Sequence, residues 1–422
     1  MQKVANTTTA NTNLHDAKKN KKDEFYTQLS DIENELQHYK EHFKDKIVYC
    51  NCDDPLQSAF FEYFFKNFKW LDLKALITTC YKSQNYREVS TEDSPKKAYA
   101  IKIHRDDVIK DELINPQKHS IEDVDKVLSS MHPLKQVEAV LSLSLSNSQT
   151  QSQETLKAFE ANKHKLFENF RAELESGLPK ESTQKSTKSP KHPKLFEITE
   201  DKGLNNAGDF RSKDCIELLK LADIVVTNPP FSLFREYVAQ LVEYKKKFLM
   251  IAPLNAITYK EVFKLIKENK LWLGYGFRAG NAYFKIKKEA SKNFANGVYD
   301  EKTGLVKFRN VTWVTNLTHR KRTEILETIA SYKKNPEQYP KYDNYDAINV
   351  DKTIEIPLDY NGIMGVPITF LDKHNPKQFE ILGLDDHRVE WRGRGPDLNG
   401  KALYRRIIIR KIAEVDELRK AE

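Results

Sequence analysis

The sequence predicts an α/β fold built on a mostly parallel sheet, and two stretches carry this prediction. Residues 47–51 form an apolar, β-rich run, and an acidic turn, an aromatic helix over 59–68 and a second strand over 73–79 follow it. Strand, turn, helix and strand in this order are typical of a nucleotide-binding α/β sheet. The second stretch, Ile224–Thr227, is a β-branched run of the kind found in buried parallel strands.

Further elements of both kinds follow along the chain. Apolar side chains at 29, 32, 36 and 39 share one helical face, and they predict a helix before the first strand. Strands are expected over 98–103, 247–254 and 308–316, with a hairpin around 274–276. Helices are expected to end at 221 and to cover 234–244 and 260–270. This mixture of strands and helices again favours an α/β sheet.

The composition indicates a globular chain long enough for a large domain and a smaller one. Of the 422 residues, 39% are hydrophobic and 31% are charged, and no apolar run approaches the roughly 20 residues of a membrane span. We therefore expect a soluble, cytoplasmic protein that does not enter a membrane. The four cysteines, at 50, 52, 80 and 215, lack the spacing of metal ligands or of a disulfide framework, so neither is predicted.

Shifts in composition predict where the regions of the chain begin and end. Residues 1–22 are polar and lack an apolar core, which predicts a disordered tail and no signal peptide. Residues 105–200 contain Ser/Gln-rich, charged and Lys/Ser/Thr/Pro-rich stretches, and they predict a long low-complexity insertion or linker, partly disordered. The sheet domain would comprise residues 23–104 and 201–320, and residues 321–422 would form a smaller C-terminal region.

The strand Ile224–Thr227 runs directly into Asn228, Pro229, Pro230 and Phe231. Neither proline can donate to a sheet ladder, so the strand ends here, at the edge where open α/β sheets bind ligands. The turn suits methyl transfer to a planar exocyclic amine such as adenine N6. The Asn228 side-chain oxygen and the Pro229 carbonyl would accept its two N–H groups, and Phe231 would stack on the base. The alternative is a purely structural proline turn with a packed phenylalanine.

Together with five other segments, this turn makes the sequence resemble the EcoRI-type adenine-specific DNA methyltransferases. The resemblance extends from about residue 23 to residue 411, except over 105–200. The five segments are Asp23-Glu24-Phe25-Tyr26-Thr27, Cys50-Asn51-Cys52-Asp53-Asp54-Pro55, Gly208-Asp209-Phe210, Val311-Thr312-Trp313-Val314-Thr315 and Gly365-Val366-Pro367-Ile368-Thr369-Phe370-Leu371-Asp372-Lys373. Asn-Pro-Pro-Phe alone is shared with ribosomal RNA and glutamine methyltransferases. An RNA or protein methyltransferase is therefore one alternative, and a DNA-binding protein without activity is another.

The resemblance implies a Rossmann-like sheet that uses S-adenosylmethionine as methyl donor, without a metal. It assigns donor binding to three segments: Phe25, Tyr26 and Thr27; Asp53, Asp54 and Pro55; and Asp209 with Phe210. An aromatic ring beside the sulfonium would add a cation–π contact of about 0.5–2 kcal/mol. The loop after the first strand departs from many relatives in the wider superfamily, because residues 56–59 contain no glycine that would let the backbone approach the donor.

The same resemblance implies double-stranded DNA as the partner. A paired adenine does not present N6 to an in-line attack, so the base would be flipped into the pocket at a cost of a few kcal/mol. Residues 388–411 carry eight Lys and Arg against two acids, and they predict a DNA-recognition surface. The candidate contacts are Arg388, Arg392, Arg394, Lys401, Arg405 and Arg406. We further expect a monomer that modifies the site of a cognate restriction endonuclease.

Overall fold

A computed structural model of the chain describes residues 26–52, 58–80, 98–105, 194–199, 201–202, 204, 206–277, 280–286, 298–385 and 397–412. Several predictions fall on other positions and so lie outside the described residues. They concern the tail 1–22, most of the insertion 105–200, and seven candidate site residues: Phe25, Asp53, Asp54, Pro55, Arg388, Arg392 and Arg394.

The chain divides into two compact units. Unit 1 comprises Met1–Ala252 and Arg278–Arg309, and unit 2 comprises Pro253–Phe277 and Asn310–Glu422. Compactness thus groups residues on both sides of position 320 within unit 2. The division does not test what each region does, so the predicted roles of the regions stay predictions.

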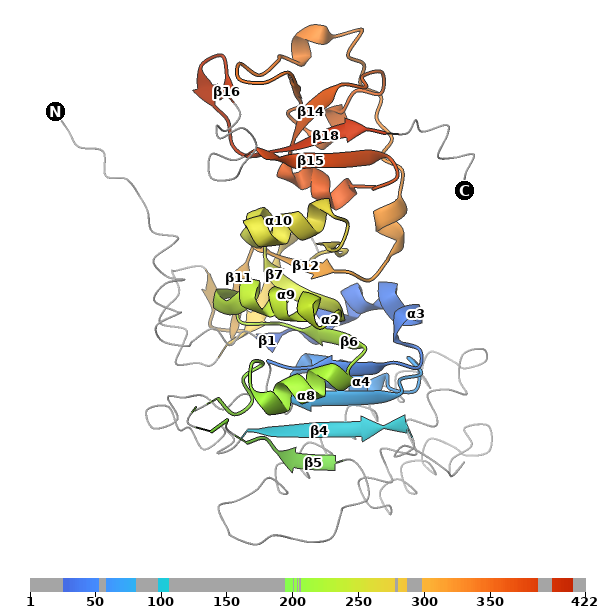
Figure 1. Cartoon of the computed structure of the whole chain (residues 1–422), viewed down its shortest axis with the longest axis vertical. Helices are drawn as coiled ribbons and strands as arrows, with labels where there is room; N and C mark the ends of the chain where they lie inside the picture. The colour runs from blue at the N-terminus through green and yellow to red at the C-terminus, as the bar shows by residue number, and fades with distance from the viewer. Residues whose placement is uncertain are drawn as a thin grey trace, which may run out of the picture. The chain divides into compact units, whose positions relative to one another are not determined.

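Six strands of unit 1 lie side by side in the order β5-β4-β3-β2-β6-β7 (Figure 1). β3, β2, β6 and β7 run parallel to one another, whereas β4 is antiparallel to both β3 and β5. This large mixed sheet confirms the predicted α/β class. The strands are β2 (Ile47–Cys50), β3 (Ala75–Thr79), β4 (Tyr99–His104), β5 (Lys194–Glu197), β6 (Ile224–Thr227) and β7 (Lys247–Pro253).

The order of the parallel strands reverses between β2 and β6. Along the chain β2 is followed by β3 on one side, whereas the next parallel strand, β6, pairs with β2 on the other side. In open α/β sheets a ligand crevice lies beyond the carboxyl ends of the strands at such a reversal. Asn51 directly follows β2 and Asn228 directly follows β6, so both side chains start at this position.

Helices of unit 1 are fixed at their ends by hydroxyl and ammonium groups. Ser58 and Ser212 cap α4 and α8 by accepting hydrogen bonds from backbone amides of the first turn. At the other end of α8, the Lys246 ammonium donates to the carbonyls of Lys220 and Ala222 at 2.9 and 2.7 Å. Figure 1 shows α8 and α9 in front of the strands. The helices are α2 (Leu29–Leu36), α3 (Lys40–Phe43), α4 (Ala59–Lys66), α8 (Lys213–Leu221) and α9 (Phe234–Glu243).

The core of unit 1 follows from apolar strands and one aromatic helix. All residues of β3 and β6 are buried, as their continuous apolar runs predict. Five aromatic side chains of α4 are also buried, and each ring of this kind removes about 150–250 Å² from water. They are Phe60, Phe61, Tyr63, Phe64 and Phe65.

A second, four-stranded sheet of unit 1 holds the start of the described chain. Its order is β1-β9-β11-β10, and β1 pairs antiparallel with β9 through Tyr26 to Lys285 and Thr27 to Phe284. Tyr26 and Thr27 are therefore extended and buried. The strands are β1 (Tyr26–Thr27), β9 (Ala282–Lys285), β10 (Tyr299–Asp300) and β11 (Leu305–Phe308).

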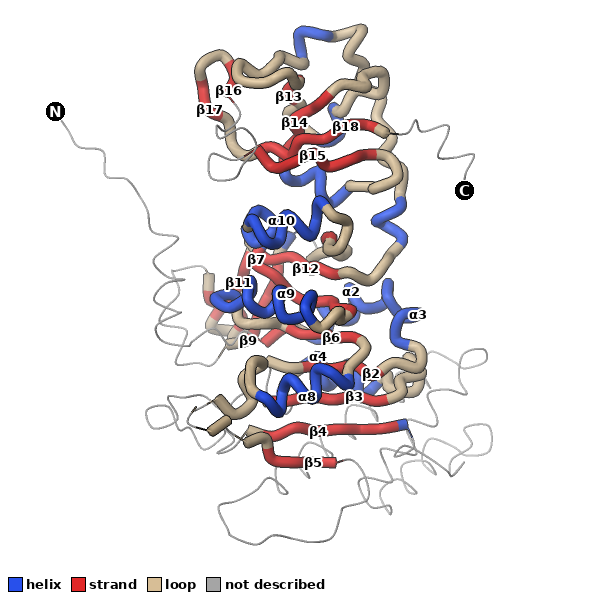
Figure 2. The backbone as a smooth tube through the Cα atoms, in the orientation of Figure 1, coloured by secondary structure: helices blue, strands red, loops and turns tan. Residues whose placement is uncertain are grey.

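Unit 2 consists mainly of strands and short 3-10 turns (Figure 2). Its four-stranded sheet has the order β13-β14-β18-β15, in which β18 is antiparallel to both neighbours. The main helix of this unit is α10 (Lys260–Lys267). The sheet strands are β13 (Ile348–Asn349), β14 (Ile363–Pro367), β15 (Phe379–Asp385) and β18 (Arg406–Lys411).

Short 3-10 segments connect the larger elements of both units. They are η1 (Gln37–Tyr39) and η3 (Phe231–Leu233) in unit 1, and η4 (Leu254–Thr258), η7 (Arg320–Thr323), η8 (Pro336–Gln338), η9 (Thr353–Glu355) and η10 (Ile368–Lys373) in unit 2. The predicted helices and strands of the described ranges are confirmed, with ends that shift by a few residues. In the described ranges, no helix is long and apolar enough to cross a membrane.

The predicted hairpin around 274–276 is wrong. β8 (Trp272–Leu273) pairs antiparallel with β12 (Val311–Thr315), so its partner comes from much later in the chain. The Trp272 indole fixes this pairing by donating to the Leu317 carbonyl at 3.0 Å. Gly276 has a φ of +93° and bends the chain, but the bend does not return it onto β8.

A hairpin that we did not predict joins β16 (Asp397–Leu398) to β17 (Lys401–Ala402). Its two turn residues, Asn399 and Gly400, have φ values of +51° and +70°. Positive φ at both central positions defines a type I′ turn, for which Asn-Gly is the strongest short sequence signal. The dipeptide in the sequence was therefore sufficient to predict this hairpin.

Candidate active site

The turn after β6 brings a buried amide to the reversal point of the sheet. Asn228 is 8% exposed, Pro229 is buried, and Phe231 begins η3 while remaining half-buried. The Pro230 carbonyl accepts from the Leu233 amide at 3.0 Å, which closes the 3-10 turn. Within the described part of the chain, no group donates to the Pro229 carbonyl. Of the two proline carbonyls, Pro229 thus retains its accepting capacity, as the predicted mechanism requires.

Asn228 contacts a residue from the other sheet of unit 1. The Asn228 Nδ2 lies 3.5 Å from the Thr27 Oγ1, although 201 residues separate the two along the chain. Both residues are almost fully buried. Because the amide nitrogen faces Thr27, the side-chain oxygen faces away from it. The structure therefore brings Thr27, of the predicted donor segment, into contact with Asn228, of the predicted catalytic turn.

A second contact ties the end of β2 to the end of β6. The Thr227 hydroxyl donates to the Asn51 carbonyl, and the Tyr237 hydroxyl of α9 donates to the Asn51 Oδ1. All three residues are buried. Burial raises the pKa of Tyr237 well above its ordinary value, so its hydroxyl stays protonated and continues to donate. Hydrogen bonds from β6 and α9 thus hold both the main chain and the side chain of Asn51 in place.

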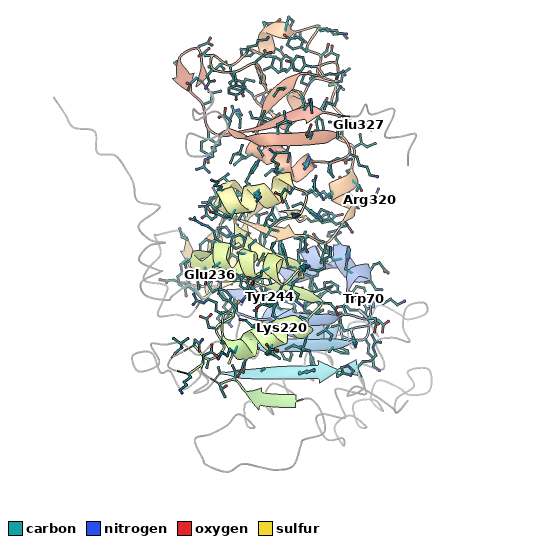
Figure 3. All side chains as sticks on the ribbon, in the orientation of Figure 1. Trp70, Lys220, Glu236, Tyr244, Arg320 and Glu327 are labelled. Atoms are coloured by element: carbon teal, nitrogen blue, oxygen red, sulfur yellow. The ribbon has the colours of Figure 1, made fainter. Side chains whose placement is uncertain are left out.

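Asp209 forms a forked ion pair two residues along the chain. The Arg211 Nε and Nη2 donate to the Asp209 Oδ1 and Oδ2 at 2.8 and 2.7 Å, and the Arg211 amide adds a third bond at 2.9 Å. These bonds raise the pKa of Arg211 further above its ordinary value. The Asp209 Oδ2 accepts one described bond, so it keeps a lone pair for a further donor. Arg211 also lies 3.4 Å from Glu236. Glu236 belongs to α9 and is labelled in Figure 3.

Phe210 is packed against the same network. Its ring meets the Tyr237 ring edge to face at a centroid distance of 5.0 Å, and its carbonyl accepts from Gln240 Nε2 at 3.0 Å. Tyr237 therefore touches Asn51 through its hydroxyl and Phe210 through its ring. A single buried side chain thus links Phe210, of a predicted donor-binding segment, to Asn51 at the end of β2.

The turn after β2 starts without a glycine, but one residue takes the conformation that glycine usually supplies. Cys52 has a φ of +74°, which lies in the left-handed region. The chain therefore bends sharply just before Asp53, Asp54 and Pro55, which lie outside the described residues. Among the described residues of this turn, Cys52 thus takes the left-handed conformation that glycine usually supplies.

Comparison with known proteins decides which family this site belongs to. The family model for the adenine-specific methyltransferase EcoRI matches residues 13–412, nearly the whole chain. The chain belongs to this family. It is 40% identical to the Type II methyltransferase M.EcoRI of Escherichia coli over 402 residues, which cover 94% of this chain and 95% of that one. The family confirms the predicted class of enzyme, an adenine-specific DNA methyltransferase.

Two mycoplasma proteins are also similar along most of their length. The chain is 30% identical to the Type II methyltransferase M.MgeORF184P of Mycoplasma genitalium, over 94% of this chain and 97% of that one. It is 32% identical to the Type II methyltransferase M.MpnI of Mycoplasma pneumoniae, over 87% and 83%. No solved structure matches the chain.

In unit 2 of this methyltransferase, two predicted DNA contacts are occupied by the protein itself. The Arg405 guanidinium donates to the Thr258 hydroxyl. The Arg406 guanidinium donates to the Asn349 Oδ1 at 3.2 Å and to the Tyr404 carbonyl at 3.0 Å, and its side chain is only 13% exposed. Lys401 is exposed on β17. The structure therefore separates the basic stretch into internal donors and a surface cation.

Sequence reasoning missed three residues of the candidate active site: Asn51, Tyr237 and Arg211. Asn51 lies at the carboxyl end of a parallel strand, so the same rule that selects Asn228 also selects it. Arg211 follows Asp209 closely enough to predict an ion pair. Tyr237 offered no comparable signal, because an apolar helix position is usually filled by a core residue. Among the described residues, no three His, Cys, Asp or Glu side chains cluster as a metal site would require.

Proposed function

We propose that this enzyme methylates N6 of an adenine that has been flipped out of duplex DNA into the crevice between β2 and β6. The contact of Asn228 with Thr27 carries the proposal, because it unites two segments that were assigned different roles in one reaction. Membership of an adenine-specific family supports the choice of base. The reversal of strand order between β2 and β6 supports a Rossmann-like site at this edge.

Catalysis would depend on two fixed acceptors rather than on a titrating base. Adenine N6 is a weak nucleophile because its lone pair is delocalised into the ring. The Asn228 Oδ1 and the Pro229 carbonyl would accept its two N–H groups and draw the nitrogen towards a tetrahedral shape. Phe231 would stack on the flipped base, and such stacking contributes about 1–3 kcal/mol. Because the prolines and Thr27 hold the acceptors in place, little reorganisation would accompany the reaction.

The described residues fit S-adenosylmethionine, which supplies a methyl group on a sulfonium when bound. Thr27 can donate its hydroxyl proton to the carboxylate of the donor while it accepts from Asn228. The free lone pair of Asp209 suits an amino group, and the Phe210 ring offers an apolar surface. Tyr26, together with Phe25, Asp53, Asp54 and Pro55, would complete this binding site.

The remaining roles concern the partners. Unit 2 would hold and recognise duplex DNA, as its basic stretch and the names of the relatives suggest. The three relatives are named Type II methyltransferases, so we propose that this enzyme is the modification partner of a restriction endonuclease that acts on the same site. It would act as a monomer, one site per chain.

The decisive experiment combines methyl-labelled S-adenosylmethionine with unmethylated DNA and compares two variants. Wild type should deposit N6-methyladenine at one short sequence. Asn228→Ala should lower kcat about 100- to 1,000-fold, the usual loss when one stabilising group is removed from a transition state. Asn335→Ala, an exposed asparagine of unit 2, is the matched control and should react as wild type.

Two results would contradict the proposal. If the label appears in RNA or in protein glutamine and not in DNA, the Asn-Pro-Pro-Phe turn acts on another class of substrate. Wild-type turnover by Asn228→Ala would show that the amide does not take part in the reaction.

A further inference from the structure

Among the three residues between the β16–β17 hairpin and β18 is a tyrosine with an exposed ring. Tyr404 is 67% exposed, a high value for an aromatic side chain in a folded domain. The Arg405 guanidinium lies 5.9 Å from the centroid of this ring. A single exposed aromatic ring needs no special explanation by itself. The hydrogen bonds that hold the backbone of Tyr404 do need an explanation.

The carbonyl of Tyr404 is fixed by a network of side-chain hydrogen bonds that extends from the surface to the buried Asn349. Arg406 Nη1 donates to this carbonyl at 3.0 Å, and Arg406 Nε donates to Asn349 Oδ1. The same Asn349 oxygen accepts from the Tyr342 hydroxyl at 2.8 Å, and Asn349 Nδ2 donates to Asp351 at 2.8 Å. A cation, an amide and a phenol are thus used to hold one exposed residue in place.

The hairpin that precedes Tyr404 is fixed in a similar way. The Asp343 carboxylate accepts from the Gly400 amide at 2.8 Å, and the Asp343 amide donates to the Asp397 carbonyl at 2.9 Å. The type I′ turn is therefore braced at its tip and at its base. An aromatic ring on a rigid backbone loses little conformational entropy on binding, since only its two side-chain torsions need to be fixed.

The charges near Tyr404 favour contact with bases over contact with phosphates. The guanidinium groups of Arg405 and Arg406 donate within unit 2, as described above. Asp343 and Asp351 are exposed carboxylates that belong to the same bracing network, and they would repel a phosphate. A neutral ring is not repelled in this way, and every base offers a face on which it can stack.

We infer that Tyr404 stacks on a base of the DNA substrate, and that Arg406 is a positioning residue for this ring rather than a phosphate ligand. The inference rests on the proposed DNA substrate. Aromatic and apolar side chains that enter a base step partly unstack it, so this contact would unstack the base step that Tyr404 meets.

The test measures the binding of a fluorescent DNA duplex that contains the sequence that the wild-type enzyme methylates. Tyr404→Ala should raise Kd about 10- to 100-fold, and Tyr404→Phe should restore binding because the phenyl ring also stacks. Because the ring carries no charge, the slope of log Kd against log salt should stay that of wild type. The matched control is Tyr283→Ala: Tyr283 is a 40% exposed tyrosine of β9 with Lys307 5.8 Å from its ring.

A second readout follows the stacking directly. 2-Aminopurine, placed in turn at each position of the site, should change its emission at one position with wild type and Tyr404→Phe, but not with Tyr404→Ala. Arg406→Lys keeps the charge but cannot make the forked contacts, so it should lose this signal while the salt slope is unchanged. Equal unfolding temperatures would exclude loss of folding as the cause.

Several outcomes would overturn the inference. One is a Tyr404→Ala variant that equals wild type in Kd and in 2-aminopurine emission, and another is a Tyr283→Ala variant that shows the same loss as Tyr404→Ala. Arg406→Gln removes the charge, and a salt slope reduced by about one in that variant would assign Arg406 to a phosphate. If wild type methylates DNA and Tyr404→Ala binds normally, only this inference fails. If wild type neither binds nor methylates duplex DNA, the proposed function fails as well.

Discussion

Asn228 in unit 1 and Arg406 in unit 2 can be compared, because each carries a planar polar group at one end of a strand: Asn228 follows β6, and Arg406 begins β18. The Asn228 amide nitrogen meets Thr27 at 3.5 Å, a long contact that directs its oxygen away from Thr27. Arg406 instead donates to Asn349 and to the Tyr404 carbonyl and lies 3.7 Å from Asp351. The polar group predicted to catalyse keeps its oxygen directed away from this contact, whereas the cation predicted to bind DNA is used within the protein.

The difference shows which sequence features determine function. A turn such as Asn-Pro-Pro-Phe fixes its own backbone, so the position from which its side chains start is largely encoded locally. A run of arginines fixes nothing locally, and its donors are used by whichever acceptors the fold brings near. Counting charge therefore predicts a polyanion partner for the region but cannot predict which cations reach it.

Acid should have the largest effect, and it should act on unit 2. His374 is 5% exposed, and burial lowers its pKa from 6.5 to about 4. Between these two values the unfolded chain binds the proton and the folded chain does not. The free energy of unfolding should therefore fall as the pH is lowered from 6.5 to 4, by about 3 kcal/mol in total.

Hydrogen exchange locates this loss. Amides of β15 and β18 should become less protected between pH 6.5 and pH 4, after correction for the intrinsic rate, by more than those of β2 and β6. His374→Gln retains a donor for the Phe379 carbonyl that His374 contacts at 2.9 Å, but it cannot take up a proton. In this variant the protection of these amides should no longer fall between pH 6.5 and pH 4. An unchanged fall would assign the effect to another titratable group.

The next largest effect is expected in unit 1, at the hydroxyl of Tyr237. Tyr237→Phe removes the hydroxyl that donates to Asn51 and leaves a buried acceptor without that donor. Such a loss costs about 1–3 kcal/mol of stability. If Tyr237 also positions the turn after β2, KM for S-adenosylmethionine should rise several-fold and kcat should fall.

Tyr49→Phe is the matched control for this prediction. Tyr49 is equally buried, and its hydroxyl bonds to Thr79 at 3.1 Å, a residue of β3 that has no part in the candidate site. Both variants should unfold at lower temperature than wild type, and only Tyr237→Phe should change KM. Equal KM values in the two variants would show that Tyr237 only stabilises the core.

Much of unit 1 was predictable from the sequence, and the reason is local. The strand and turn around Asn228 follow from β-branched residues and two prolines, and the role of Tyr26 and Thr27 follows from family resemblance. The link between Thr27 and Asn228 spans 201 residues, so no local pattern could predict it. In unit 2 the partners of Arg405 and Arg406 lie 147 and 57 residues away, which is why their internal use was not foreseen.

A smaller effect should follow when the direction of the catalytic amide is disturbed. Thr27→Val keeps the size of the side chain but removes the oxygen that Asn228 Nδ2 faces. The amide could then rotate, so a fraction of molecules would present nitrogen to the substrate amine. We expect kcat to fall about 5- to 10-fold, which corresponds to the loss of one ordinary hydrogen bond. Thr27→Ser should restore it, and a Thr27→Val enzyme with normal kcat would leave the amide oriented by other contacts.

The smallest expected effect distinguishes two cations of the basic stretch, Lys401 and Arg405. Lys401 is exposed on β17, so Lys401→Gln should reduce the salt slope of DNA binding by about one if this ammonium meets a phosphate. Arg405→Gln removes the same formal charge, but its guanidinium donates to Thr258 within unit 2, so the slope should stay at the wild-type value. The two variants change net charge equally, and any model based on charge alone predicts the same slope for both. Equal slopes would remove the distinction between surface and internal cations, whereas a difference of about one would show that the acceptors inside unit 2 decide which cations reach the DNA.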